Sequence, residues 1–110
     1  MVEYKIYYSF ESIIDLESIY NYISSDQSNY SVALKIINEL KESVNSLNYL
    51  PLRHGRVLWS PWKDIGVRAF ALKQYVIFYL VDETKKIVNI VRILSCRRDI
   101  PSEIKMMVEK

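Results

Sequence analysis

The sequence predicts an α+β domain with the order β-α-α-β-β-β, in which an antiparallel helical hairpin packs on one face of a small, mainly antiparallel sheet. Three patterns predict this fold. A strand-like run opens the chain, two helical patterns with a short polar break follow, and three strand-like runs joined by short turns come after them. Because the chain has 110 residues, half of them hydrophobic, we expect a single domain over residues 1–110.

The first strand is predicted over residues 2–8, VEYKIYY, which are rich in aromatic and β-branched residues. Ser9 is a suitable N-cap for a helix over residues 10–24. A second helix is predicted over residues 29–48, whose apolar stripe consists of Ala33, Ile37, Leu40, Val44 and Leu47. The short polar connection SSDQSN implies that the two helices are antiparallel neighbours.

The second half of the chain begins with a predicted loop or irregular strand over residues 49–65, which holds two prolines, a glycine and both tryptophans. A meander of three antiparallel strands follows over residues 66–72, 75–82 and 87–95. The turns are predicted at Lys73-Gln74 and at residues 83–86.

Alternation along these strands divides their side chains between two faces. The wholly apolar set is expected to face the helices, and it comprises Val67, Ala69, Ala71, Val76, Phe78, Leu80, Val91 and Ile93. The other set comprises Arg68, Phe70, Leu72, Tyr75, Ile77, Tyr79, Ile90, Arg92 and Leu94. A two-residue turn at 73–74 places Arg68 opposite Tyr79, and a symmetric turn at 83–86 places Arg92 opposite Ile77 and diagonal to Tyr79.

These pairings predict a cluster of Arg68, Tyr79 and Arg92 on the face away from the helices. Two guanidinium groups and a phenol can bind a phosphate or stabilise the charge that develops when a phosphodiester is cleaved. Alternatively, the arginines pair with carboxylates such as Asp82 or Asp99, or lie over the tyrosines. The apolar residues of the same face either form a partner surface or are covered by residues 49–65.

Charge differs between the two parts of the chain: residues 1–50 carry a net charge of −4, and residues 51–110 carry +6 with all six arginines. This split indicates an acidic or polyanionic partner, or simply a solvated acidic helical hairpin. Arg53, Arg56, Arg97 and Arg98 are therefore candidates for contacting a target or its phosphates. With no apolar run of about 18 residues, no signal-peptide pattern and a single cysteine, we expect a cytoplasmic protein without a membrane segment.

His54 and Cys96 are the remaining chemically reactive side chains. His54 is either a general base or ordinary polar surface. Cys96 is predicted to be a small core residue, although the two arginines that follow it would favour a thiolate. One Cys and one His do not make a typical zinc site, and no phosphate-binding loop is present, so we expect neither a metal nor a cofactor.

Four segments, in this order, resemble the RelE/ParE superfamily, the toxins of type II toxin–antitoxin (plasmid stabilisation) modules: DLESIYNYI (15–23), GVRAFAL (66–72), YVIFYLVD (75–82) and IVRILSCRRDI (90–100). The resemblance implies the same β-α-α-β-β-β fold and a cytoplasmic toxin that a cognate antitoxin neutralises, in a toxin–antitoxin hetero-oligomer. Two targets occur in the superfamily. RelE-like members cleave mRNA at the ribosome, whereas ParE-like members inhibit DNA gyrase and lack the catalytic set.

The resemblance assigns Arg68 and Arg92 to phosphate binding and transition-state stabilisation in the mRNA-cleaving branch. That branch often carries a histidine or tyrosine near the end of the last strand, where this chain has Ser95-Cys96-Arg97-Arg98. Tyr79 or His54 would have to replace it as acid or base. We therefore expect a ParE-like toxin that binds a topoisomerase such as DNA gyrase; the alternatives are a metal-independent, ribosome-dependent endoribonuclease (an mRNA interferase) and a degenerate, non-toxic interaction module.

Overall fold

The computed structural model describes residues 2–27 and 29–96, without the side chains of residues 26 and 27. The elements are β1 (Lys5–Tyr8), α1 (Phe10–Gln27), α2 (Tyr30–Asn45), the 3₁₀ turns η1 (Ser46–Asn48) and η2 (Pro51–Arg53), α3 (Trp62–Ile65), β2 (Arg68–Leu72), β3 (Tyr75–Asp82) and β4 (Ile87–Ser95). The predicted element order is confirmed, and α3 is a short helix inside the predicted loop.

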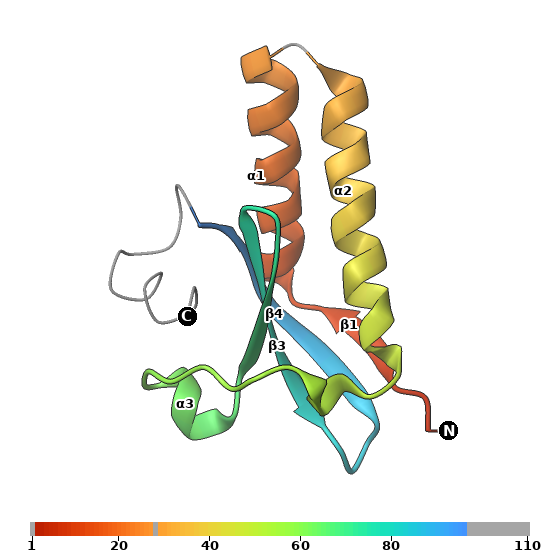
Figure 1. Ribbon diagram of the computed structural model, residues 1–110, viewed down its shortest axis with the longest axis vertical. Coiled ribbons are helices and arrows are strands. Elements are labelled where there is room, and N and C mark those ends of the chain that lie inside the picture. Colours follow the sequence, from red (N-terminus) through yellow and green to blue (C-terminus); the bar gives the residue numbers. More distant parts are fainter. Residues whose placement is uncertain (1, 28, 97–110) are drawn as a thin grey trace.

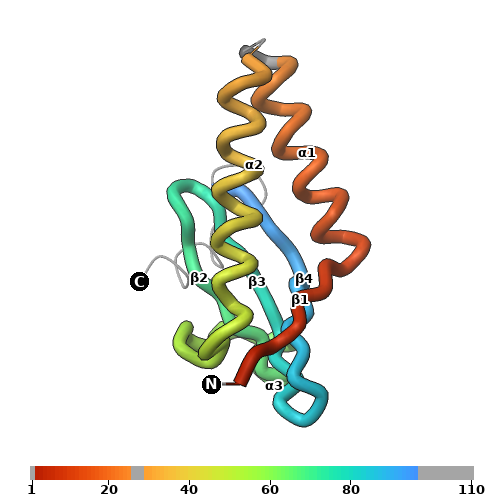
Figure 2. The backbone as a smooth tube through the Cα atoms, turned by 90° about the vertical axis from the view of Figure 1, so that its right-hand side faces the viewer, coloured from red at the N-terminus to blue at the C-terminus, as the bar shows by residue number. Residues whose placement is uncertain are grey.

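The four strands form one sheet in the order β1-β4-β3-β2, with β1 parallel to β4 and the other pairs antiparallel. Helices α1 and α2 lie side by side and antiparallel, and their far ends project beyond the sheet (Figures 1 and 2). None of the helices within the described residues is long and apolar enough to cross a membrane.

Local signals in the sequence fix the helix starts. The Oγ of Ser9 accepts a hydrogen bond from the Ser12 N–H at 3.0 Å, so the predicted N-cap of α1 is confirmed. The side chain of Asn29 caps α2 in the same way, by accepting from the Val32 N–H at 3.1 Å. The predicted apolar stripe of α2 is buried along its length and packs on α1 and the sheet.

The predicted assignment of sheet faces is wrong for β2 and β3. The helix-facing core contains Tyr75, Ile77 and Tyr79, and Phe70 and Leu72 pack against it. A second, smaller core on the opposite face is built from Val57, Val67, Val76, Phe78 and Cys96, with Trp59 and Trp62 packed over it. Both alternating sets are almost wholly apolar, so hydrophobicity alone did not distinguish the two faces.

The predicted pairing of β4 with β3 is correct only up to Ile90. A bulge shifts the register between Phe78 and Tyr79, so that Arg92 lies opposite Phe78 and Ile93 opposite Ile77. Before the bulge, Ile90 lies in the helix-facing core with its partner Tyr79 and Val91 packs on the opposite face, the reverse of the prediction. Beyond the bulge, Ile93 and Leu94 pack on the predicted sides.

The segment between η1 and β2 passes around the free edge of β2. Its first part lies on the helix-facing side, where Pro51 contacts Tyr79. Gly55 and Val57 then form backbone hydrogen bonds with Ala69 and Val67 along the edge. Trp59 and Trp62 follow on the opposite face.

Candidate functional site

Residues 49–54, which we call the clamped loop, are held by side chains that the sequence predicted as a functional cluster. The hydroxyl of Tyr79 donates a hydrogen bond to the Pro51 carbonyl at 2.6 Å. Nη1 of Arg68 donates to the carbonyls of Leu52 at 3.2 Å and of His54 at 2.6 Å. The predicted pairing of Arg68 with Tyr79 across β2 and β3 is confirmed, and it brings both side chains under one loop.

Arg53 holds the first part of the same loop. Its Nη1 donates to the carbonyls of Tyr49 at 2.7 Å and Leu50 at 3.1 Å, and its Nη2 donates to Ser46 Oγ at 3.0 Å. Three side chains thus bind the backbone carbonyls of five of the six loop residues. A loop whose carbonyls are bound in this way has a defined backbone conformation.

The fully buried phenol of Tyr79 is a weak acid at this position. Burial raises its pKa to about 12, against the smaller opposing effects of Arg68 and Arg53. At neutral pH the hydroxyl is protonated and serves as a donor to Pro51. The arrangement makes Tyr79 a structural donor, and no proton transfer is required of it.

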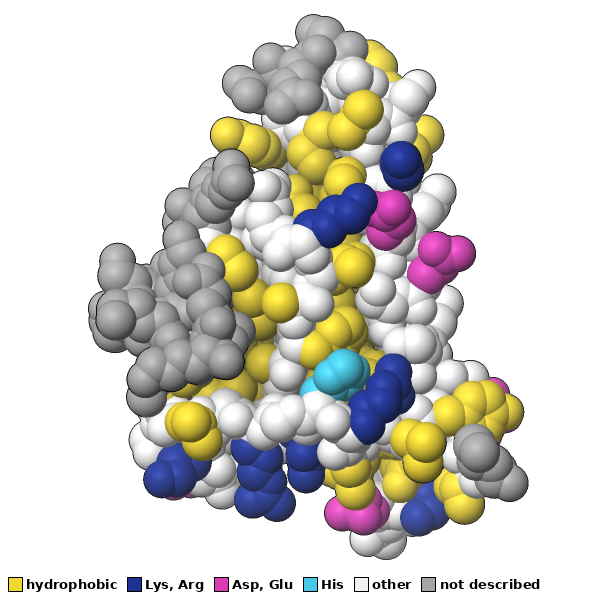
Figure 3. All heavy atoms as spheres, viewed as in Figure 1, with side chains coloured by type: hydrophobic (Ala, Val, Ile, Leu, Met, Phe, Trp, Pro, Cys, Tyr) yellow, Lys and Arg dark blue, Asp and Glu magenta, His cyan; other side chains and the backbone are white. Residues whose placement is uncertain are grey.

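His54 stands at the end of the clamped loop, with its imidazole stacked on Phe70 at 4.4 Å between ring centroids and 16° between planes. The ring of Tyr79 meets it edge-on at 6.3 Å. Burial, with the neighbouring charge of Arg53, lowers the pKa of His54 below its ordinary value, so the imidazole is neutral at pH 7. In Figure 3 the histidine (cyan) is seen at the surface beside a basic side chain, at the lower end of a strip of hydrophobic residues.

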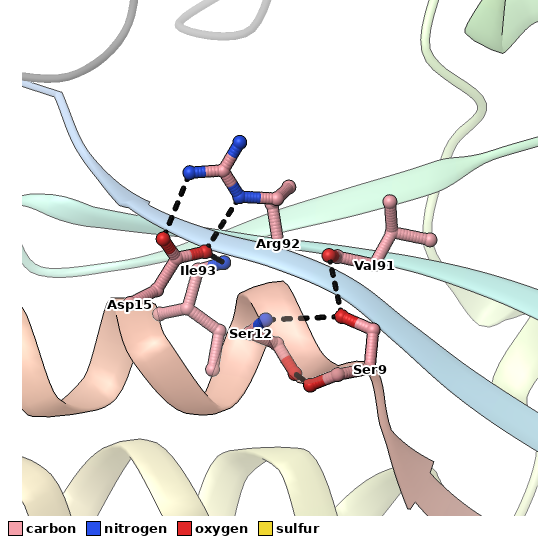
Figure 4. Close-up of polar contacts among 6 residues, drawn as sticks. All are labelled: Ser9, Ser12, Asp15, Val91, Arg92 and Ile93. Carbon is pink, nitrogen blue, oxygen red and sulfur yellow. Dashed lines mark hydrogen bonds and ion pairs between the residues drawn. The ribbon is translucent and has the colours of Figure 1, made fainter.

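Arg92 does not join this cluster, which corrects the predicted grouping. Its Nε and Nη2 bind the two carboxylate oxygens of Asp15 on α1 at 2.7 and 2.8 Å (Figure 4). The bulge in β4 places Arg92 opposite Phe78, away from Tyr79. The alternative of a carboxylate partner therefore holds for Arg92, which binds Asp15; of the two carboxylates suggested by the sequence, Asp99 lies outside the described residues.

Sequence reasoning missed Asp15, although a signal was present. Asp15 lies beside Leu16 and one turn before Ile19 on the buried side of α1, and a carboxylate buried there needs a partner. Its Oδ2 also accepts a hydrogen bond from the backbone N–H of Ile93 at 2.9 Å. The remaining predicted candidates have other positions: Arg56 is exposed at the edge of β2, and Arg97 and Arg98 lie outside the described residues.

The cluster offers a neutral imidazole, guanidinium groups and exposed apolar side chains. Among the residues that the structure describes, no three His, Cys, Asp or Glu side chains come together as a metal site. Cys96 is buried at the end of β4, in the core that covers the opposite face, as a small apolar residue would be.

Comparison with known proteins identifies the family. Residues 6–100 match the family described as the ParE toxin of the type II toxin–antitoxin system parDE. No curated protein sequence matches the chain. Two solved structures share the fold. The chromosomal ParDE toxin–antitoxin system from P. aeruginosa matches with a TM-score of 0.71 and 22% identity, over 86% of this chain and 98% of that chain. The toxin–antitoxin complex RelBE2 from Mycobacterium tuberculosis matches with a TM-score of 0.65 and 20% identity, over 86% of this chain and 99% of that chain. The chain therefore belongs to the ParE toxin family and is the toxin of a type II toxin–antitoxin system.

Proposed function

We propose that this toxin inhibits growth by binding a topoisomerase such as DNA gyrase, and that it does so without cleaving RNA. One observation supports this proposal most directly: the side chains that a nuclease would direct at a phosphate make contacts within the chain. Arg68 and Tyr79 hold the clamped loop, and Arg92 binds Asp15. A transition state is stabilised by donors aimed at the reacting atoms, and these donors are aimed at the protein itself.

A cognate antitoxin is the second partner that we propose. Both structural relatives are described as toxin–antitoxin assemblies, one ParDE and one RelBE2. We infer that the neighbouring gene encodes a short antitoxin and that the two proteins form a hetero-oligomer. If no antitoxin gene lies beside the toxin gene, this part of the proposal is wrong.

Ribosome-dependent cleavage of mRNA is the second candidate, and the state of His54 favours it. A neutral imidazole at pH 7, beside Arg53 and close to Arg68, can take the proton of an RNA 2′-hydroxyl as that oxygen attacks the adjacent phosphate. An arginine would then stabilise the phosphorane, which collapses to a 2′,3′-cyclic phosphate as the P–O5′ bond breaks and the leaving 5′-oxygen takes a proton from water; no metal would be needed. Tyr79 does not serve as the base in this scheme, because its raised pKa keeps the hydroxyl protonated at neutral pH.

The experiment that separates the two candidates uses His54→Phe. A phenylalanine keeps a flat ring to stack on Phe70 but transfers no proton. If the toxin acts on a topoisomerase, the variant remains toxic, and the purified wild-type protein inhibits DNA supercoiling by gyrase. If the toxin cleaves mRNA, the variant loses about 100-fold or more in cleavage rate, and induction of the wild type stops protein synthesis before DNA synthesis.

A further inference from the structure

The clamped loop holds apolar side chains outward into solvent. Leu50 is 63% exposed, and Leu52 and Tyr49 are each 40% exposed. Leu50 also has a left-handed backbone conformation with φ of 50°, which residues other than glycine, asparagine and aspartate rarely adopt. A leucine with a strained backbone and a mostly exposed side chain contributes little to the stability of the fold.

The bonds to the loop carbonyls maintain this unfavourable arrangement. Arg53 binds the carbonyl of Leu50 itself, and Tyr79 binds that of the next residue, Pro51. The fold thus uses charged and buried donors to present two leucines in one fixed conformation. Such pre-organisation is typical of binding loops, because ordering entropy is then not lost on association.

The apolar surface extends from the loop to the start of the chain. Leu50, Pro51 and Leu52 line a groove of about 410 Å³ together with Val2, Tyr4 and Arg53. Val2 is 55% exposed. The loop and the N-terminal segment therefore form one continuous apolar patch that a second surface can cover.

The charge around this patch specifies the chemistry of its partner. Around the loop, residues 43–63 contain no aspartate or glutamate, whereas Arg53, Arg56 and Lys63 are basic. At the N-terminal end of the patch, the carboxylate of Glu3 accepts a hydrogen bond from Asn48. A second copy of this chain, placed loop to loop, would bring these like charges together. The complementary surface combines apolar side chains with carboxylates at its rim.

We propose that the clamped loop is the surface with which the toxin docks on the protein that it inhibits, and that the docking site there is an apolar pocket with an acidic rim. This inference rests on the proposed function, in which the toxin acts by binding a protein. Leu50 and Leu52 enter the pocket, and Arg56 faces its carboxylates. Arg53, Arg68 and Tyr79 are positioning residues that hold the loop in its docking conformation.

The test compares charge insertions at two exposed leucines of the full chain, Leu50 in the loop and Leu34 on α2. Leu50→Asp places a carboxylate in the loop, where its left-handed conformation accepts aspartate, and Leu34→Asp does the same on α2, where the leucine is 52% exposed. We expect Leu50→Asp to weaken growth inhibition and binding to purified gyrase holoenzyme about tenfold or more. Leu34→Asp should retain both, and the two variants should keep the thermal midpoint and the affinity for purified antitoxin.

Leu50→Gly separates docking from folding, since it removes the side chain and relieves the left-handed strain together. The variant should be at least as stable as the wild type and less toxic. Full toxicity of Leu50→Asp and Leu50→Gly would overturn the proposal, as would a defect confined to antitoxin binding. If wild-type toxin leaves gyrase unaffected, the choice of target fails, but the growth assay with the Leu50 and Leu34 variants still decides whether the loop docks.

Discussion

Asp15 on α1 and Arg92 on β4 are joined by two short hydrogen bonds, and the same carboxylate accepts the backbone N–H of Ile93. The contact lies where β1 has ended and no longer pairs with β4, as Figure 4 shows together with the contacts of Ser9 to Ser12 and Val91. The start of α1 thus takes the place of a neighbouring strand along this part of β4. The pair fastens the helical hairpin to the sheet.

We predict that Asp15→Ala destabilises the protein by about 2 kcal/mol, because it leaves a guanidinium group and a backbone donor without their acceptor. The loss is smaller than for a fully buried pair, since the side chain of Arg92 is 37% exposed. Urea denaturation measures it. Glu17→Ala is the matched control, because this carboxylate is exposed on the same helix and its removal should change stability by less than about 0.5 kcal/mol. Equal effects of the two substitutions would argue against a fastening role.

The raised pKa of Tyr79 predicts a loss of stability in alkali. The folded state holds the phenolic proton more tightly, with a pKa of about 12 against the ordinary 10.0, so this contribution is complete below pH 10 and declines as the pH rises from 10 to 12. The expected slope is about 1.4 kcal/mol per pH unit for one group. Urea midpoints at pH 9 and 11 measure it, and Tyr79→Phe should lose less stability over this interval than the wild type. Burial also raises the pKa of Tyr8, so this second tyrosine causes some loss of stability in alkali in the wild type and in Tyr79→Phe alike. Parallel losses in both proteins would contradict the assignment.

The lowered pKa of His54 predicts a second loss of stability, in mild acid. Below the ordinary pKa of 6.5 the unfolded chain takes up a proton that the folded imidazole resists, so stability falls as the pH drops from 6.5 toward the lower folded value. His54→Phe lacks the titrating group and keeps a ring for the stack on Phe70. Its unfolding free energy should decline less than that of the wild type between pH 7 and pH 5.5. A larger decline in the variant would refute this reading of the site.

Because Trp59 and Trp62 pack over Phe78 on the face opposite the helices, we predict that Phe78→Ala changes both stability and tryptophan fluorescence. Phe78 is fully buried, and its ring centroid lies 4.8 Å from that of Trp62 and 6.1 Å from that of Trp59. Removing the ring should reduce stability by about 3–5 kcal/mol and shift tryptophan emission to longer wavelength. Phe70→Ala, on the helix-facing side, is the comparison variant and should leave the emission spectrum unchanged. A spectral shift in Phe70→Ala alone would mean that the faces are assigned the wrong way round.

Much of the fold followed from local patterns. The order of elements, the capping of α1 by Ser9 and the bounds of the last two strands were all predictable, because they depend on spacing and on neighbouring residues. The pairing of Arg68 with Tyr79 was predictable too, since a two-residue turn sets the register of a hairpin.

Other features depended on contacts between distant parts of the chain. Which face of the sheet meets the helices did not follow from hydrophobicity, because both faces are apolar; Val57, Trp59 and Trp62 cover the face opposite the helices. The bulge at Val91 moved Arg92 away from Tyr79, and Asp15 then became its partner across 77 residues of sequence.

By itself, the sequence determined a β-α-α-β-β-β toxin fold and the pairing of Arg68 with Tyr79 across two strands. Only the tertiary structure decided that these two residues lie on the helix-facing side and what they bind there. Arg53, Arg68 and Tyr79 bind loop carbonyls, because a backbone that passes over a sheet needs donors for its carbonyls. No local pattern encodes that passage, since it arises from the packing of residues 49–65 against strands that follow them in the sequence.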